Sequence, residues 1–262
     1  MILKEPALPD IRTLARVLAS ERGCPEADAL SEARGAWGLA ALDQEPPAAQ
    51  RLAAALAAAG IPALALPQNL LEELPPVTAV TRAEISGSEV RLQDSAAAAH
   101  LLAAGDIALL SAAVIKRRVT QTITLSKGSG ILRKTVQLGA LLATGLPFPL
   151  GNARREETRS LESSELARVL DICLRSPARR LRLESEDFDY SCLLARKTYQ
   201  ALANFRTLAR ELAALWPDAQ RNHGLHILQE GLPLRDMRYD SLADLDRESR
   251  WLLTLRSLRS AP

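Results

Sequence analysis

The stretch that decides the fold runs from residue 77 to residue 92 and reads VTAVTRAEISGSEVRL. Its first part, residues 77–85, is rich in β-branched side chains, which favour strands. Ser86 and Gly87 are typical of a tight turn, and residues 89–92 can pair back on the first part. We therefore expect a β-hairpin here. Because the residues before it have a helical period, the chain is predicted to be an α+β protein.

Three helices are predicted before the hairpin. Asp10 is a good N-cap for a helix over 10–22, which Gly23 ends. A second helix opens at Pro25 and extends to about residue 34. A third helix covers residues 44–59, where alanine and leucine predominate.

Two short apolar runs, 37–42 and 61–66, flank the third predicted helix and are expected to be strands. The order strand, helix, strand predicts a parallel βαβ crossover. Pro75 and Pro76 mark the expected boundary of this unit. Residues 1–75 are therefore predicted to form a small α/β domain.

The part after the hairpin is predicted to be mostly antiparallel β structure. Residues 95–102 could form a short helix or a loop, and residues 166–174 a helix or a strand, with a strand favoured at the end. Phe188, Tyr190 and Cys192 alternate with polar residues, as in a half-buried strand. The same alternation predicts strands over 119–125 (VTQTITL) and 180–184 (RLRLE).

Two helices are expected to complete the chain. The clearest covers 199–216 and keeps its leucines on one face before Pro217. The last covers about 241–258 and begins with a capping box, in which Ser241 precedes Asp244 by three residues. We therefore expect a β domain over 76–230 and a C-terminal helical extension over 231–262. Strands followed by one amphipathic helix resemble the element order of pleckstrin-homology-like small barrels.

The segment 107–155 contains no aspartate or glutamate. The whole chain has 33 basic and 31 acidic residues, so the remainder of the chain is acidic overall. Near an anionic membrane surface each lysine or arginine contributes about 1 kcal/mol. Two alternatives stay open, an anionic partner or neutralisation by acidic residues of the same chain. The candidate anion-binding residues, over 116–134, are Lys116, Arg117, Arg118, Lys127, Arg133 and Lys134.

Residues 128–135, GSGILRKT, partly match a phosphate-binding loop. Lys134 would contact phosphate, and Thr135 would bind Mg²⁺. However, the pattern requires glycine where Arg133 stands, because glycine lets the backbone N–H groups turn inward around the phosphates, and an arginine side chain opposes that turn. A glycine turn in a β-hairpin is the simpler interpretation of this loop.

Two further groups of polar residues have structural explanations. His223 and His226 could share a metal ion, but no cysteine cluster lies nearby, so we expect a pair of loop histidines and no metal site. The acidic run Glu184, Glu186, Asp187 and Asp189 alternates with aromatic residues, which is typical of a solvated strand edge. The run is also a natural partner for the basic segment.

Composition limits the classes of function. Three widely spaced cysteines indicate reduced thiols in a cytoplasmic protein, and no run reaches the roughly 20 apolar residues of a spanning helix. Aromatic residues make up only 3% of the chain, which argues against single-stranded nucleic-acid binding, and no recognition helix for duplex DNA is evident. The sequence indicates no cofactor.

The sequence therefore predicts a non-catalytic binding or regulatory module. Its basic β-turn surface, residues 116–134, would bind an anionic membrane surface, with peripheral attachment there, or an acidic protein. One alternative is a nucleotide-dependent enzyme or switch that uses residues 128–135. Another is a structural subunit that assembles with itself or another chain through the apolar segment 136–150.

Overall fold

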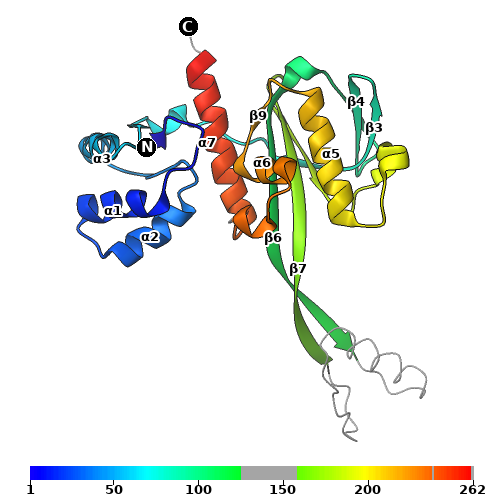
Figure 1. The fold of residues 1–262 in the computed structure, drawn as a ribbon, viewed down its shortest axis with the longest axis horizontal. Helices are drawn as coiled ribbons and strands as arrows, with labels where there is room; N and C mark the ends of the chain where they lie inside the picture. Colours follow the sequence, from blue (N-terminus) through cyan, green and yellow to red (C-terminus); the bar gives the residue numbers. More distant parts are fainter. Residues whose placement is uncertain (125–157, 238, 261–262) are drawn as a thin grey trace, which may run out of the picture. The chain divides into compact units, whose positions relative to one another are not determined.

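The structure is a computed structural model that describes residues 1–124, 158–237 and 239–260 (Figure 1). One compact unit consists of Met1–Lys116 with Leu166–Pro262, and Arg117–Glu165 form a second unit. Apart from Arg117, the side chains described below belong to the first unit. Its helices and its mixed sheet confirm the predicted α+β class.

The main sheet has seven strands in the order β5-β4-β3-β8-β7-β6-β9. Neighbours pair antiparallel in β3–β4, β4–β5 and β7–β8, whereas β3–β8 and β6–β9 are parallel. The resemblance to pleckstrin-homology-like barrels concerns only the order of the elements and stays a prediction. The strand bounds are β3 Val77–Ser86, β4 Glu89–Asp94, β5 Ala99–Leu102, β6 Ile107–Thr124, β7 Thr158–Leu174, β8 Arg179–Glu184 and β9 Gln220–Arg221.

The hairpin predicted over residues 77–92 is confirmed as β3 and β4. Its two-residue loop is formed by Gly87 and Ser88, one residue later than expected. Gly87 has φ +59°, a left-handed conformation that glycine adopts without steric strain. Ser86 pairs with Glu89 on either side of the loop, so the turn sets the register of both strands.

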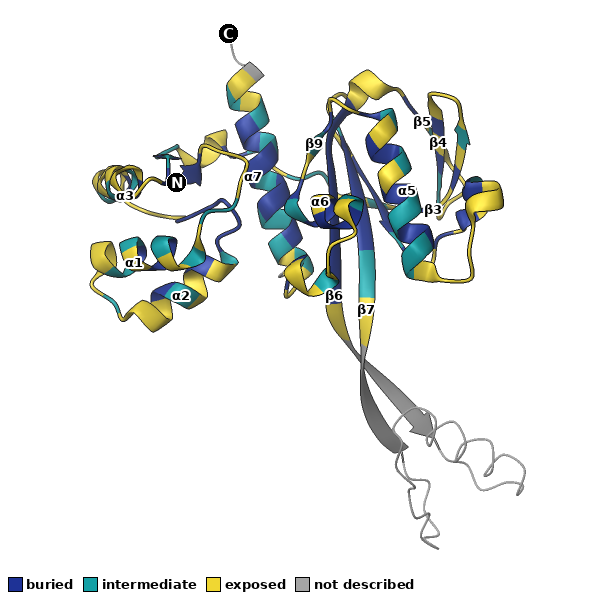
Figure 2. Cartoon of the chain, viewed as in Figure 1, coloured by how far each residue is buried: buried dark blue, intermediate teal, exposed yellow. Residues whose placement is uncertain are grey.

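Alternate residues of β7 and β8 face opposite sides of the sheet. On one side, Leu170, Ile172 and Leu181 share a core with Phe205 and Leu208 of helix α5 (Ala201–Leu215). On the other side lies helix α7 (Leu242–Ser260), whose Asp246 contacts Arg180 of β8. Figure 2 shows the strands between these helices as largely buried.

The N-terminal segment forms a second core on three helices, α1 Ile11–Arg22, α2 Glu26–Gly35 and α3 Pro46–Ala58. The first helix begins as predicted, because the Asp10 side chain accepts a hydrogen bond from the backbone N–H of Thr13. The predicted strand over 37–42 does not form. The expected parallel crossover is replaced by an antiparallel pair of two-residue strands, β1 Ile2–Leu3 and β2 Ala63–Leu64.

Helix α7 belongs to both cores. Leu245 packs in the core beside the sheet, whereas Trp251, Leu252 and Leu255 pack in the N-terminal core. The indole N–H of Trp251 donates to the Leu3 carbonyl at 2.8 Å. Helix α7 is therefore covered on more than one side. The predicted division at residues 75 and 230 stays a prediction.

Two other local predictions differ from the structure. Residues 99–102 form the edge strand β5 and not a helix or loop. The expected strand with alternating Phe188, Tyr190 and Cys192 is replaced by the 3-10 segment η3, Tyr190–Arg196. Asp189 starts this segment by accepting a hydrogen bond from the backbone N–H of Ser191, which turns the chain away from the sheet. The remaining 3-10 segments are η1 Gln68–Leu70, η2 Ala104–Asp106 and η4 Leu234–Met237.

Candidate binding cleft

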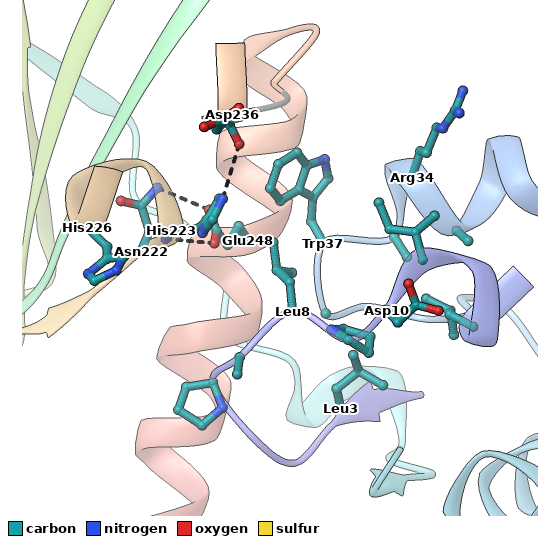
Figure 3. Close-up of a pocket in the computed structure, with 18 of the residues that line it drawn as sticks. Leu3, Leu8, Asp10, Arg34, Trp37, Asn222, His223, His226, Asp236 and Glu248 are labelled. Carbon is teal, nitrogen blue, oxygen red and sulfur yellow. Dashed lines mark hydrogen bonds between the residues drawn. The ribbon is translucent and has the colours of Figure 1, made fainter. Parts of the chain in front are cut away.

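A cleft of about 1460 Å³ lies between the N-terminal segment and the C-terminal part of the chain (Figure 3). One wall comes from residues 3–14 and 30–38, and the other from parts of 221–248. Both walls belong to the first compact unit. Two of the lining residues, Asn222 and Glu248, form a buried polar cluster with Tyr239, and these contacts determine what the site can do.

Asn222 connects helix α6 (His223–Glu230) to strand β6. Its Oδ1 accepts hydrogen bonds from the backbone N–H groups of Leu225 and Ala112, both at 2.9 Å. Its Nδ2 donates to the carbonyl of Ala112 at 3.0 Å. The side chain is therefore the N-cap of α6. It also satisfies the backbone N–H and carbonyl of Ala112 in β6, as a neighbouring strand would.

Glu248 of α7 is 2% exposed and accepts three hydrogen bonds. The donors are Asn222 Nδ2 at 3.0 Å, the backbone N–H of His223 at 3.0 Å and the hydroxyl of Tyr239 at 2.5 Å. Burial raises the pKa of Glu248, and these three donors partly oppose that rise. Burial and the adjacent Glu248 carboxylate also raise the pKa of Tyr239.

Gly224 allows α6 to lie against the sheet. A Cβ at this position would stand 1.9 Å from the carbonyl oxygen of Ala112, so only glycine fits. Its backbone N–H donates to the Tyr239 hydroxyl at 3.0 Å. Gly224 therefore joins helix α6 to the polar cluster.

Trp37 contributes the aromatic part of the cleft. Its ring stacks on Tyr239 with a centroid distance of 4.3 Å and an interplanar angle of 14°. The Trp37 backbone has φ +43°, a conformation that bulky residues rarely adopt. Gly38 follows with φ +82°, and a Cβ there would stand 1.8 Å from the ring of Trp251. The two consecutive positive φ angles bend the chain at Trp37 and Gly38, and the indole lies against Tyr239.

A second buried polar cluster lies between the sheet and α7. Asp171 accepts hydrogen bonds from Arg180 at 2.5 and 2.9 Å and from Arg182 at 2.7 and 2.8 Å. Arg180 also contacts Asp246 of α7, whose side chain is 41% exposed. The alternation of the strand RLRLE therefore does not mark a solvent face, because α7 covers its arginines.

Two of the six predicted anion-binding residues can be placed by their side chains. Lys116 and Arg117 are exposed, immediately after the buried run Ile107 to Ile115 of β6. The backbone of Arg118 continues the strand. Lys127, Arg133 and Lys134 lie outside the described residues, as do the glycine loop 128–135 and the apolar segment 136–150.

His223 and His226 lie in helix α6 and not in a loop. They are three positions apart, and the ring of His223 contacts the carbonyl oxygen of Asp236 at 3.2 Å. Among the residues described, no group of three or more His, Cys, Asp or Glu side chains could hold a metal ion.

The acidic run that was a predicted partner of the basic segment has local partners. Glu186 pairs with Arg168, and Asp189 pairs with Lys197 at 3.6 Å. Asp189 also caps the 3-10 segment that follows it. These two carboxylates therefore interact with cations outside residues 107–155.

Sequence reasoning missed Trp37, Asn222 and Glu248, which line the cleft, and Tyr239, which contacts all three. The signal for Asn222 was available, since asparagine directly before a helix is a preferred N-cap. Trp37, Tyr239 and Glu248 gave no signal, because they come from distant parts of the chain. No described helix is both long and apolar enough to cross a membrane. Comparison with protein-family models, curated sequences and solved structures finds no significant match.

Proposed function

We propose that the protein is a non-catalytic binding or regulatory module that presents the basic β-turn surface, residues 116–134, to an anionic membrane surface. The observation that carries this proposal is the change along β6. Residues 107–115 are buried in the core, and the strand becomes exposed at Lys116 and Arg117, where the basic segment begins. An exposed cation at the position of Lys116 can interact with a partner of opposite charge.

Four carboxylates outside the basic segment have local cationic partners, which supports this proposal over their use in neutralising that segment. The carboxylates of Glu186 and Asp189 interact with Arg168 and Lys197. Asp171 and Asp246 interact with arginines of β8. Each of these acidic groups has a cationic partner outside the carboxylate-free segment.

The contacts of Glu248 favour a structural role over a catalytic one. Both oxygens of its carboxylate accept hydrogen bonds from the protein, and the side chain is 2% exposed. A general base needs contact with the proton that it removes, directly or through water. The hydrogen bonds of Glu248 connect α7 to α6 instead, so its contacts support a structural role.

Cosedimentation of the full chain with liposomes tests the proposal. We expect binding to vesicles with anionic lipid at low salt, loss of binding at high salt, and no binding to neutral vesicles. The double variant Lys116→Gln/Arg117→Gln should bind roughly 30-fold more weakly, since each cation contributes about 1 kcal/mol. The control variant Arg16→Gln/Arg51→Gln removes two exposed cations from helices α1 and α3 and should bind like the parent.

The outcomes separate the alternatives. No binding to anionic vesicles at low salt would refute the membrane proposal. Equal loss of binding in the two double variants would show that net charge alone controls binding. Capture of an acidic protein by the parent but not by the Lys116/Arg117 variant, without vesicle binding, would replace the membrane with a protein partner.

A further inference from the structure

The cleft is lined by a tryptophan whose indole N–H has no hydrogen-bond partner among the residues that the structure describes. Trp37 is 4% exposed, yet within the described part of the chain its indole N–H donates to no atom. Its nitrogen is not among the enclosed polar atoms that lack a partner, unlike that of Trp216. The nitrogen is therefore reachable from the cleft that the residue lines.

A cation without a described partner lines the same wall. Arg34 is exposed in the last turn of α2, three residues before Trp37, and makes no ion pair with any residue that the structure describes. In Figure 3 the nitrogen of the Trp37 ring points to the side of the cleft on which Arg34 lies. An indole N–H and a guanidinium are both donors, and guanidinium groups bind carboxylate and phosphate oxygens in a bidentate manner.

The backbone at this point supports a binding role. Trp37 adopts φ +43° although it is a bulky residue, and its ring is held against Tyr239 by stacking. Such conformations cost about 1–3 kcal/mol and persist where the surrounding structure requires them, often at ligand sites. Tyr239 is in turn hydrogen-bonded to Glu248 and Gly224, so the indole is held in one orientation before a ligand arrives.

We infer that this cleft is a binding site for a small molecule or peptide that carries an oxyanion, which Trp37 Nε1–H and Arg34 bind together. Carboxylate and phosphate share the chemistry that these donors recognise. Carboxylates on the cleft, including Asp236, Asp240 and Glu230, add a negative field and disfavour ligands of high negative charge. This site uses none of residues 116–134, so it is independent of the proposed membrane surface.

Two-dimensional ¹H–¹⁵N spectra of the full chain test this inference directly. The three tryptophans give three indole N–H signals. Trp251 Nε1 is bonded to the Leu3 carbonyl, which makes its signal an internal control. The Trp37 signal is assigned by its loss in Trp37→Phe. Titration uses sodium acetate and sodium phosphate, with sodium chloride at matched ionic strength as the reference.

We expect the Trp37 signal to shift in a saturable way with acetate, phosphate or both, while the Trp251 signal stays unchanged. The anion that acts at lower concentration identifies the source of the oxyanion. Arg34→Gln should weaken this binding roughly tenfold or more, because a charge-assisted hydrogen bond is lost. Arg51→Gln, an exposed arginine of α3 outside the cleft lining, should have no effect.

Two results would overturn the inference. One is a Trp37 signal that moves no more with either anion than with chloride. The other is saturable binding that Arg34→Gln leaves unchanged. If Trp37→Phe fails to fold, the remaining indole signals can be assigned from Trp216→Phe and Trp251→Phe, so the titration of the parent protein remains decisive.

Discussion

Replacement of Asn222 by alanine should destabilise the protein far more than the loss of an ordinary helix cap. The change removes the N-cap of α6, which costs about 1 kcal/mol. It also leaves the buried N–H and carbonyl of Ala112 without partners, at about 1–3 kcal/mol for each group. Together these losses predict a fall of at least about 3 kcal/mol in the free energy of unfolding.

The matched control is Asp10→Ala. Asp10 caps α1 through a 2.8 Å hydrogen bond from the backbone N–H of Thr13, but it is exposed and connects no other element. Its removal should therefore cost about 1 kcal/mol. The two variants thus differ mainly in the buried contacts that Asn222 makes with β6.

Urea unfolding of the full chain measures both variants. The fluorescence of the buried residues Trp216 and Trp251 reports on the two cores, and circular dichroism reports on the helices. Asn222→Ala should lower the urea midpoint well below that of Asp10→Ala with a similar slope. If the two variants lost equal stability, Asn222 would act only as a helix cap, and the argument that it satisfies β6 would be wrong.

Three further predictions concern single positions. Gly224→Ala should cost about 3 kcal/mol or more, because its Cβ would overlap the Ala112 carbonyl, whereas Gly105→Ala, with open space around it, should be nearly neutral by the same urea measurement. The raised pKa of Glu248 means that its contribution to stability is complete below the ordinary carboxyl pKa of 4.5 and declines as pH rises through the folded-state value. The melting temperature of the parent should therefore fall relative to Glu248→Gln over this interval, and parallel pH profiles would contradict this sign. Cys173 should resist a thiol reagent until unfolding, because burial raises its pKa to about 12, and rapid modification in the native state would refute this.

The elements that sequence reasoning predicted well are those with local causes. The β3–β4 hairpin depends on β-branched residues and one glycine turn, and α1 depends on Asp10 and a periodic apolar face. Such signals lie within a few residues of the structure that they determine. Residues 99–102 and η3 were predicted wrongly, because short apolar or alternating runs fit more than one structure until their neighbours are known.

The sequence by itself determined the class of the protein, most of its helices and its central hairpin, together with the charge asymmetry of residues 107–155. Only the tertiary structure decided that α7 joins two cores, that Arg180 and Arg182 are buried with Asp171, and that Trp37 meets Tyr239 beside Glu248. The physical reason is sequence distance. Periodicity and capping act over a few residues, whereas burial of a polar side chain depends on which distant element covers it and supplies its hydrogen bonds.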